Sequence, residues 1–384
     1  MKINKSILAV LLGLSVASLQ AGDVFMSGST AMRAVIYNAL MTPNVVFGSA
    51  PTFTGYGGKG NGDTYMAFSG TLVGGSGTTV VKCYWSGSEA GIQDIALGNS
   101  ETFIADGALN GQDNAGTPAG AAAQTTTVNL AMADNAQTYS RTKTPSLTGT
   151  EVGIVTFKWV RNPGLWTGTN VTDSQIRQAF SGAAPLAVFS GNNGDTNSFV
   201  YVEGRDTSSG TRVNALGDTG EGILTSINQI ETDSNGNMVN VAGQGYFGNT
   251  GFSSGGSLAA VMGVSTTTTI DHVNTGTAGF STIAYLGYND AKTALGDGAV
   301  ECSYDGVPFS TNNIINGTYS FWGNEYIYKA NNVTSGGTPE AYAVYSSLAS
   351  IGKGLDTIFD GVSAIPLDAM HSSRPGPTGD PAHY

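Results

Sequence analysis

Residues 199–212 have the sequence FVYVEGRDTSSGTR, and this stretch decides the expected fold. The apolar run from Phe199 to Val202 is typical of a buried strand, and a helix is predicted to follow the turn. The turn holds one cation, Arg205, together with the hydroxyls of Ser209 and Thr211. A guanidinium, hydroxyls and the first free N–H groups of a helix are all donors that suit an anion. The stretch therefore predicts a strand, an anion-binding turn and a helix, and a helix cap with a solvated arginine is the alternative.

The same order of strand, small-residue turn and helix is predicted at two earlier places. Val24 to Met26 lead through a Ser-Gly-Ser-Thr turn to a helix over 31–41, and Val80 to Trp85 lead through Ser86-Gly87-Ser88 to a helix over 89–97. Alternating strands and helices predict an α/β fold with mainly parallel sheets flanked by helices. Since the carboxyl ends of parallel strands share one edge of a sheet, the three turns are expected to converge.

The rest of the chain adds further predicted elements. Strands are expected at 128–132, 153–160 and 283–288, and helices at 172–180, 255–261 and 339–350. Asp173 and Ser174 are the candidate caps of the helix at 172–180. A hairpin is expected over 230–241, and a calcium loop there is disfavoured because the acidic closing residue is missing.

Two polar, glycine-rich segments and the end of the chain are expected to lie outside the core. Residues 44–78 predict loops or a hairpin insertion, and residues 99–127 predict an exposed insertion. The tail after Met370 is rich in Pro, Gly and Ser and is expected to be loose.

Composition and the first residues indicate an exported protein. Lys2 and Lys5 precede the apolar run from Ile7 to Val16, which is typical of a cleaved signal peptide. Cleavage is expected after Ala21, with Ala17 as the alternative, and no Cys stands there to carry a lipid anchor. A periplasmic or secreted location is therefore expected. The net charge of −12 argues against nucleic acid and anionic membranes as partners.

The cysteines and histidines define few options for cross-links or metals. Cys83 and Cys302 are the only cysteines, and they form either a disulfide or two separately buried thiols. Two cysteines and three histidines argue against a structural zinc site, so neither a metal nor a cofactor is predicted.

Seven short motifs occur in an order that resembles a known family. They are Gly28-Ser29-Thr30-Ala31-Met32, Gly87-Ser88-Glu89-Ala90-Gly91, Asp134, Gly153 to Val160 with Asn162-Pro163, Arg205 to Arg212, Ile283 to Tyr288, and Asn316-Gly317-Thr318-Tyr319. This order resembles the phosphate-binding proteins of ABC transporters, which have the type 2 periplasmic binding protein fold. The resemblance covers nearly the whole mature chain.

The resemblance implies two domains with a ligand cleft between them. Residues 22–152 and 317–384 would form domain 1, and residues 153–316 would form domain 2. The implied ligand is inorganic phosphate or a similar oxyanion, a membrane permease is the implied partner, and the protein is expected to be a monomer without enzymatic activity. The implied phosphate ligands are Thr30, Ala31, Met32, Ser88 and Asp134 from domain 1, and Arg205, Ser209, Gly210 and Thr211 from domain 2.

Asp134 is the implied source of ligand specificity. A carboxylate beside an anion is repulsive unless it accepts a proton from that anion. Phosphate near neutral pH carries such a proton and sulfate does not, so an acceptor at Asp134 is expected to favour phosphate. An ordinary turn residue at the end of the strand is the alternative interpretation.

Two other classes of function compete with solute binding. One is a surface or extracellular protein that retains the binding fold for sensing or adhesion, which the glycine-rich insertions favour. The other is an enzyme, a serine hydrolase or a phosphatase, and the hydrolase is suggested because residues 251–255 match the pattern G-x-S-x-G. That pattern requires a buried strand before it, whereas residues 245–250 are glycine-rich, and no histidine motif completes it. No catalytic residue is therefore predicted.

Overall fold

The computed structural model describes residues 22–241, 245–274, 279–354 and 357–383, so the predicted signal peptide lies outside the described residues. The described strands form one sheet of 14 strands and two separate pairs, β5 with β7 and β17 with β18. The main strands of the large sheet are β1 (Val24–Gly28), β2 (Thr52–Tyr56), β3 (Tyr65–Thr71), β4 (Thr78–Tyr84), β8 (Leu130–Ala133), β9 (Thr148–Arg161), β12 (Phe199–Glu203), β13 (Ser281–Gly287), β14 (Val300–Tyr304) and β15 (Trp322–Lys329). Its short strands are β6 (Asp113–Asn114), β10 (Asn170–Val171), β11 (Ala184–Pro185) and β16 (Ala364–Ile365).

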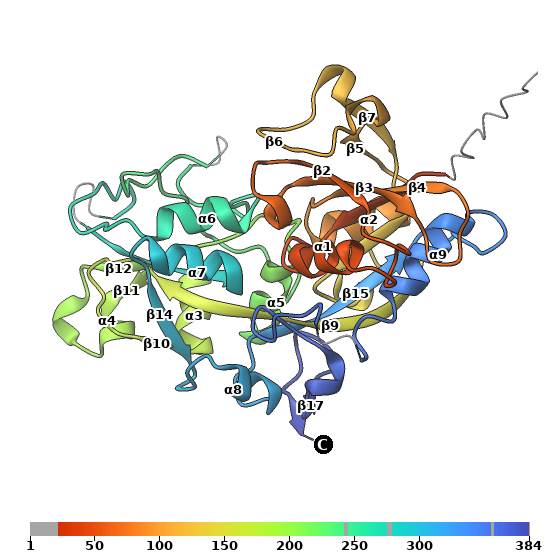
Figure 1. The fold of residues 1–384 in the computed structure, drawn as a ribbon. Helices are drawn as coiled ribbons and strands as arrows, with labels where there is room; N and C mark the ends of the chain where they lie inside the picture. Colours follow the sequence, from red (N-terminus) through yellow and green to blue (C-terminus); the bar gives the residue numbers. More distant parts are fainter. Residues whose placement is uncertain (1–21, 242–244, 275–278, 355–356, 384) are drawn as a thin grey trace, which may run out of the picture.

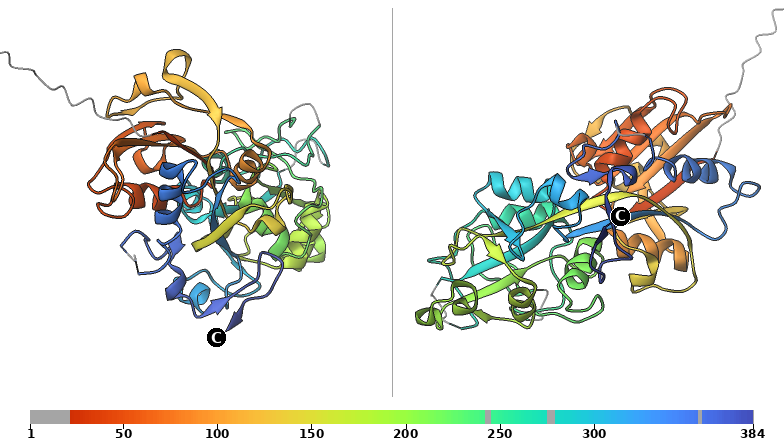
Figure 2. Two further views of the ribbon diagram at one scale, coloured as in Figure 1. Left: turned by 90° about the vertical axis from the view of Figure 1, so that its right-hand side faces the viewer. Right: turned by 90° about the horizontal axis from the view of Figure 1, so that it is seen from below.

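The large sheet has two sections that long strands connect. The first section has the order β8-β1-β4-β3-β2-β6 and the second has β11-β12-β13, with β9 and β15 between them. Figures 1 and 2 show β9 and β15 running from one section into the other. At the centre of the sections β1 is parallel to β4 and β8, and β12 is parallel to β13, whereas β9 and β15 pair in antiparallel fashion. The predicted α/β class is confirmed, and the parallel pairs contain the three strands that lead into the predicted turns.

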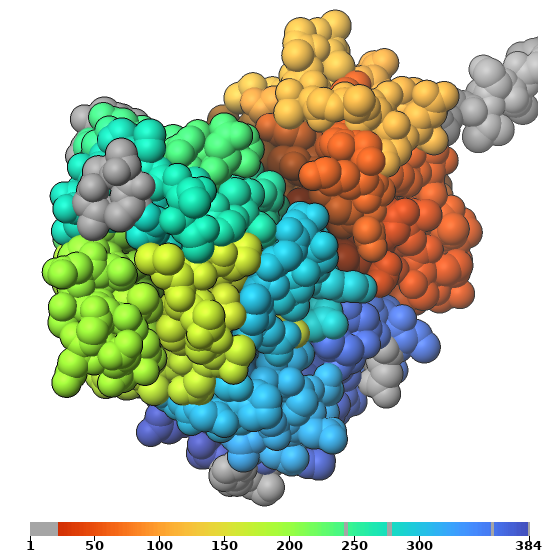
Figure 3. Space-filling view, turned by 90° about the vertical axis from the view of Figure 1, so that its left-hand side faces the viewer, coloured from red at the N-terminus to blue at the C-terminus, as the bar shows by residue number. Residues whose placement is uncertain are grey.

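Helices flank the sheet, and the space-filling view shows the two sections as separate masses (Figure 3). The first residues of the described chain, in red and orange, lie on one side, and residues from the middle of the chain, in green and teal, lie on the other. The helices are α1 (Arg33–Met41), α2 (Ser88–Leu97), α3 (Asp173–Phe180), α4 (Leu186–Ser190), α5 (Gly210–Asp218), α6 (Gly255–Met262), α7 (Tyr288–Gly296), α8 (Thr311–Ile315) and α9 (Pro339–Leu348).

The core runs along the long strands. Trp159 of β9 and Trp322 of β15 are fully buried, and Trp159 stacks on Phe321 at 5.1 Å between ring centroids. Several helices contribute an apolar face, as α1 does with Val35, Ile36, Ala39 and Leu40. Burial of these faces supplies most of the stabilisation of such helices, because isolated helices of this length are marginal in water.

Several local predictions need correction. The cap of α3 is Thr172, whose side chain accepts from the N–H of Gln175 in a capping box, rather than Asp173 or Ser174. The hairpin expected over 230–241 is reduced to one bridge between Thr232 and Met238, although Gly236 has the positive φ of 79° that the turn requires. The glycine-rich segment 99–127 contains the paired strands β5 (Ser100–Ile104) and β7 (Ala123–Thr127).

The tail is docked rather than loose. Arg374 forms a buried ion pair with Asp218 at the end of α5, at 3.0 Å between Nη1 and Oδ1. Its guanidinium also donates to the carbonyls of Trp322 (3.1 Å) and Gly376 (2.9 Å). The short strands β17 (Ser372–Ser373) and β18 (Ala382–His383) pair with each other. The composition of the tail predicted looseness because it does not reveal this distant partner on α5.

Cys83 on β4 and Cys302 on β14 are free and buried, so the alternative of two separate thiols holds. Burial raises the pKa of the Cys302 thiol to about 12. In the described residues we find no helix with both the length and the apolar character needed to cross a membrane.

Candidate functional site

The three predicted turns lie at the carboxyl ends of β1, β4 and β12, and glycines let two of them approach their neighbours closely. Gly28 has φ of 119°, and a Cβ there would lie 2.0 Å from the carbonyl oxygen of Met132. Gly87 has φ of 104°, and a Cβ there would lie 2.6 Å from the carbonyl oxygen of Ser208. These positions exclude other residues both by conformation and by space. The turn before α2 therefore packs directly on the turn before α5.

Ser88, Asp134 and Gly210 meet at this convergence. The N–H of Asp134 donates to Ser88 Oγ at 3.1 Å. A Cβ on Gly210 would lie 2.4 Å from Ser88 Oγ and 2.9 Å from the Cβ of Asp134. Asn214 of α5 donates to the carbonyls of Asp134 and Gly210, at 3.0 Å each. Three residues that the sequence predicted for one site are thus in contact, and they come from both sections of the sheet.

Two further polar side chains join this contact. The Ser29 hydroxyl donates to Asp134 Oδ1, and it also accepts from the N–H of Met32 at 3.2 Å. Glu325 of β15 lies within hydrogen-bonding reach of the Asp134 and Ser29 side chains, and its own side chain is fully buried. We call Ser29, Ser88, Asp134, Gly210 and Glu325 the inner cluster. It is dense, buried and free of cations among its members.

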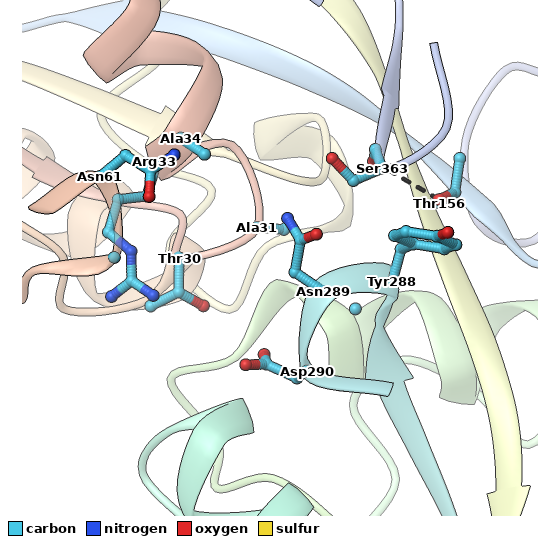
Figure 4. Close-up of a pocket in the computed structure, with 12 residues that line it drawn as sticks. Thr30, Ala31, Arg33, Ala34, Asn61, Thr156, Tyr288, Asn289, Asp290 and Ser363 are labelled. Atoms are coloured by element: carbon cyan, nitrogen blue, oxygen red, sulfur yellow. Dashed lines mark hydrogen bonds between the residues drawn. The ribbon is translucent and has the colours of Figure 1, made fainter. Parts of the chain in front are cut away.

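A pocket of about 200 Å³ lies beside the start of α1 (Figure 4). Its walls come from both sections of the sheet, and we call it the outer pocket. Figure 4 shows the Arg33 guanidinium and the Asp290 carboxylate approaching it from different elements, with Thr30 between them. The lining residues are Thr30, Ala31, Arg33, Ala34, Asn61, Gly62, Thr156, Gly287, Tyr288, Asn289, Asp290 and Ser363.

Charge is concentrated at the outer pocket. Burial lowers the pKa of Arg33, although Asp290 and Asp63 act in the opposite direction. Burial also raises the pKa of Asp290, against the effect of Arg205 and Arg33. No ion pair between these groups is recorded in the described part of the chain. Arg33 and Arg205 are therefore not neutralised by an ion pair within the described residues, and an added anion could pair with them.

Arg205 faces this charged region rather than the inner cluster. Its guanidinium donates from Nε to the carbonyl of Phe252 (3.1 Å) and from Nη2 to that of Ser253 (3.0 Å). A Cβ on Gly255 would lie 3.3 Å from Arg205 Nη1 and 1.9 Å from Asp290 Oδ2, so both charged groups border the start of α6. The structure therefore brings Arg205 near Asp290 and records no hydrogen bond from Arg205 to Ser88 or Asp134 among the described residues.

The remaining predicted ligands have distinct places. Thr30 and Ala31 line the outer pocket. The Met32 side chain is buried in the core, and its N–H is already bonded to Ser29. Ser209 caps α5 by accepting from the N–H of Arg212 at 3.3 Å, and Thr211 is buried in the first turn of that helix.

Sequence reasoning missed Ser29, Arg33, Asp290 and Glu325. Ser29 and Arg33 flank the predicted Thr30 to Met32, so the first motif contained a usable signal for both. Asp290 follows the predicted strand at 283–288, and its position after a strand end was also a signal. Glu325 gave none, because it stands inside a strand and its partner is about 190 residues away in the chain.

Among the described side chains, no hydrogen bond joins the serine of the G-x-S-x-G pattern to a histidine. Ser253 lies in the turn before α6, where its carbonyl accepts from Arg205. His272 stacks on Tyr246, and His371 contacts Asn316 Oδ1 at 3.2 Å. Across the described ranges no group of three or more His, Cys, Asp or Glu side chains is arranged to hold a metal ion.

Comparison with known proteins gave matches only among solved structures. No protein-family model matches the chain, and no curated protein matches it. The ABC-type phosphate transport receptor from Vibrio cholerae is 14% identical, with a TM-score of 0.48 and coverage of 90% of this chain and 99% of the other.

Two further solved structures extend this result. PstS from Borrelia burgdorferi is 12% identical with a TM-score of 0.41, and it covers 90% of this chain and 98% of its own. The phosphate-binding protein from Stenotrophomonas maltophilia is 12% identical with a TM-score of 0.42 and coverage of 90% of both chains. The names of the Vibrio and Stenotrophomonas proteins place them in the class that the sequence motifs resemble. At such low identities and TM-scores the function must be argued from this chain's own residues.

Proposed function

We propose that the protein is an exported solute-binding protein that holds phosphate, or a related tetrahedral oxyanion, between two domains. Domain 1 would comprise residues 22–152 and 317–384, and domain 2 residues 153–316. The observation that carries the proposal is the contact of Ser88 and Asp134 with Gly210. The outer pocket lies next to this contact, with Arg33 in its lining and Arg205 beside the lining residue Asp290. Hydroxyls, helix starts and two guanidiniums together match the donors that a phosphate dianion requires.

The anion would enter beside Thr30 and Ala31, where the outer pocket opens. Charge-assisted hydrogen bonds contribute ~1.5–3 kcal/mol each, so a set of donors offsets the dehydration of the anion once water is excluded. Ser88 and Gly210 are in direct contact, so a ligand oxygen reaches both only if the two domains separate slightly. The ligand would then bridge the domains and give their closure a physical cause.

Asp134 would select the protonation state of the ligand. Its carboxylate accepts from Ser29, and a second acceptor position remains for a proton carried by phosphate. Sulfate has no such proton and would leave a buried carboxylate facing an anion. Phosphate is therefore the ligand that we favour.

Binding is tested by phosphate-dependent stabilisation. A ligand that binds only the folded state stabilises it by about 2.7 kcal/mol at a concentration of 100 times Kd. We expect phosphate to raise the Tm of the wild type well above the effect of chloride at equal ionic strength. The Asp134→Asn variant should lose most of this increase, whereas the exposed control Asp297→Asn should retain it. The absence of any phosphate-specific increase in the wild type would overturn the proposal.

We also propose that the protein is delivered to the periplasm or outside the cell, and that a membrane permease is its partner in ABC-type uptake. Export requires removal of residues 1–21, and N-terminal sequencing of the extracytoplasmic protein is expected to begin at Gly22. A mature protein that still carries Met1 would contradict this part of the proposal.

A further inference from the structure

Glu325 is a buried carboxyl group that the proposed function has not used. It lies on β15, where its neighbour Tyr326 pairs with Ala133, the residue that precedes Asp134. Its exposure is 0%, and neither of its carboxyl oxygens has a hydrogen-bond partner in the described part of the chain. The Asp134 carboxyl and the Ser29 hydroxyl are close enough to act on the Glu325 carboxyl. The sheet thus places two acids side by side at the inner end of the candidate site.

Two buried carboxylates in contact cannot both remain ionised without a large cost. A proton on Glu325 removes that cost, because the acid then donates to Asp134 and the unpartnered contact becomes a hydrogen bond. Burial and the Asp134 charge raise the pKa of Glu325 well above its ordinary value, while the Ser29 hydroxyl acts in the opposite direction. The placement of two acids on paired strands therefore favours a proton on one of them.

The other charged groups nearby do not replace this proton. Tyr328 lies on the same strand, and Glu325 is among the charges that raise its pKa. Glu151 of β9 acts on Tyr326 instead. Arg212 of α5 is directed to Asn249 and to the carbonyl of Arg205. Among the described residues no cation is recorded as acting on Glu325, whereas the Asp134 charge does act on it.

We propose that Glu325 and Asp134 hold one proton between them and that Glu325 is a specificity-determining residue, because this proton widens the range of oxyanions that the site accepts. This inference rests on the proposed binding of an oxyanion at Asp134. Asp134 alone has no neighbouring acid with which to exchange a proton, and Glu325 supplies that partner.

The two positions of the proton suit two kinds of ligand. With the proton on Glu325, Asp134 is a carboxylate and accepts the proton-bearing oxygen of monohydrogen phosphate. If the proton moves to Asp134, the negative charge moves to Glu325, and Asp134 becomes a donor to a fully ionised anion such as sulfate. Ser29 lies within reach of both acids, so its hydroxyl stabilises whichever one is ionised. Sulfate then binds more weakly than phosphate but is not excluded from the site.

The test compares the affinities of phosphate and sulfate in two variants. In Glu325→Gln the amide still donates to Asp134 but has no acidic proton to transfer. Sulfate then loses the hydrogen bond that a protonated Asp134 would donate to it, and we expect its affinity to fall about tenfold or more. The phosphate affinity should change by less than about threefold. The control Glu203→Gln removes another fully buried acid, which accepts from Thr232, and should change neither affinity. Equal weakening of both anions in Glu325→Gln, or unchanged sulfate affinity, would overturn the proposal.

A ligand-free measurement separates this inference from the proposed function. The infrared C=O band of a protonated carboxyl group should be present in wild-type and Glu203→Gln proteins at about pH 9, two units above the pKa of about 7 to which burial raises Glu203. The band should be weaker in Glu325→Gln. Normal phosphate binding without this band difference overturns the role of Glu325 alone. The band difference without any anion binding overturns the proposed function, and the specificity role with it.

Discussion

The inner cluster and the outer pocket are adjacent and differ in almost every physical respect. The inner cluster is dense, and its Ser29 and Ser88 hydroxyls are already hydrogen-bonded within it. The outer pocket has space, two flanking arginines and the acid Asp290. The inner cluster is closed by internal hydrogen bonds, and the outer pocket has charged groups and room for an ion.

This difference suggests a division of work between attraction and selection. Cations beside an open pocket attract an anion of any protonation state, because Coulomb attraction does not distinguish phosphate from sulfate. Selection requires a donor or acceptor whose partner must carry, or lack, a proton. We therefore expect changes in the outer pocket to alter the affinity for all oxyanions together, and changes in the inner cluster to alter their ratio.

Removal of Arg205 should have the largest effect. Arg205→Ala deletes a buried cation that contacts both the 252–253 segment and the region of Asp290, and we expect phosphate affinity to fall about a hundredfold or more. Isothermal titration measures this loss, and circular dichroism checks that the fold persists. Lys292→Ala, which removes an exposed cation on α7, should bind as the wild type does. Unchanged phosphate affinity in Arg205→Ala would show that the cations at the outer pocket do not bind the anion.

A methyl group at Gly210 should disturb the contact between the two regions. In Gly210→Ala the new Cβ would lie 2.4 Å from Ser88 Oγ, so the turns before α2 and α5 must move apart. We expect the free energy of unfolding to fall by about 1–3 kcal/mol, as for overpacked sites, and phosphate binding to weaken. Gly107→Ala has open space around the new methyl group and should be neutral in chemical denaturation. An unchanged free energy of unfolding in Gly210→Ala would mean that the turns before α2 and α5 can move apart without cost, and would contradict the close packing of the inner cluster.

Removal of Arg33 should have a smaller effect that is confined to binding. No hydrogen bond or ion pair of its guanidinium is recorded in the described residues, so Arg33→Ala should leave the Tm of the free protein nearly unchanged. Loss of one charge at the pocket should weaken phosphate and sulfate about tenfold each. If the ratio of the two affinities changes instead, the separation of attraction from selection is wrong.

The most gradual effect should appear in the pH dependence of stability. Because the folded-state pKa of Glu325 is raised above its ordinary 4.5, its favourable contribution is complete below about pH 4.5 and is lost as pH rises toward the folded pKa. The wild type should lose up to about 1.4 kcal/mol per pH unit relative to Glu325→Gln over this window. Urea unfolding at a series of pH values measures the difference. Parallel curves for the two proteins would show that Glu325 does not retain its proton on folding.

Much of the fold was predictable because its signals are local. The strand-turn-helix units at β1, β4 and β12 appear in short stretches of sequence, since Gly28, Gly87 and Gly210 mark close approaches that only glycine allows. The cap of α3 was predictable in principle, because Thr172 and Gln175 form the spacing of a capping box. The choice of Asp173 or Ser174 overlooked that reciprocal pair.

The parts that the sequence did not reveal depend on distant partners. Arg374 forms a buried ion pair with Asp218, and the pairing of β15 with β8 brings Glu325 next to Asp134. Neither contact produces a pattern in the local sequence. Arg205 was identified from its motif, but its direction toward Phe252 and Ser253 depends on a bridge between segments far apart in sequence. Local sequence motifs thus predicted which residues belong to the site better than they predicted how those residues are oriented.

The most direct test of the central claim is a crystal structure of the protein grown with phosphate. The account predicts a tetrahedral anion between the two domains, bonded by Thr30, Ser88 and Arg205, with Asp134 accepting its proton and with Ser88 moved away from Gly210. Phosphate found only on the outer surface, with the contact of Ser88 and Gly210 unchanged, would contradict the account.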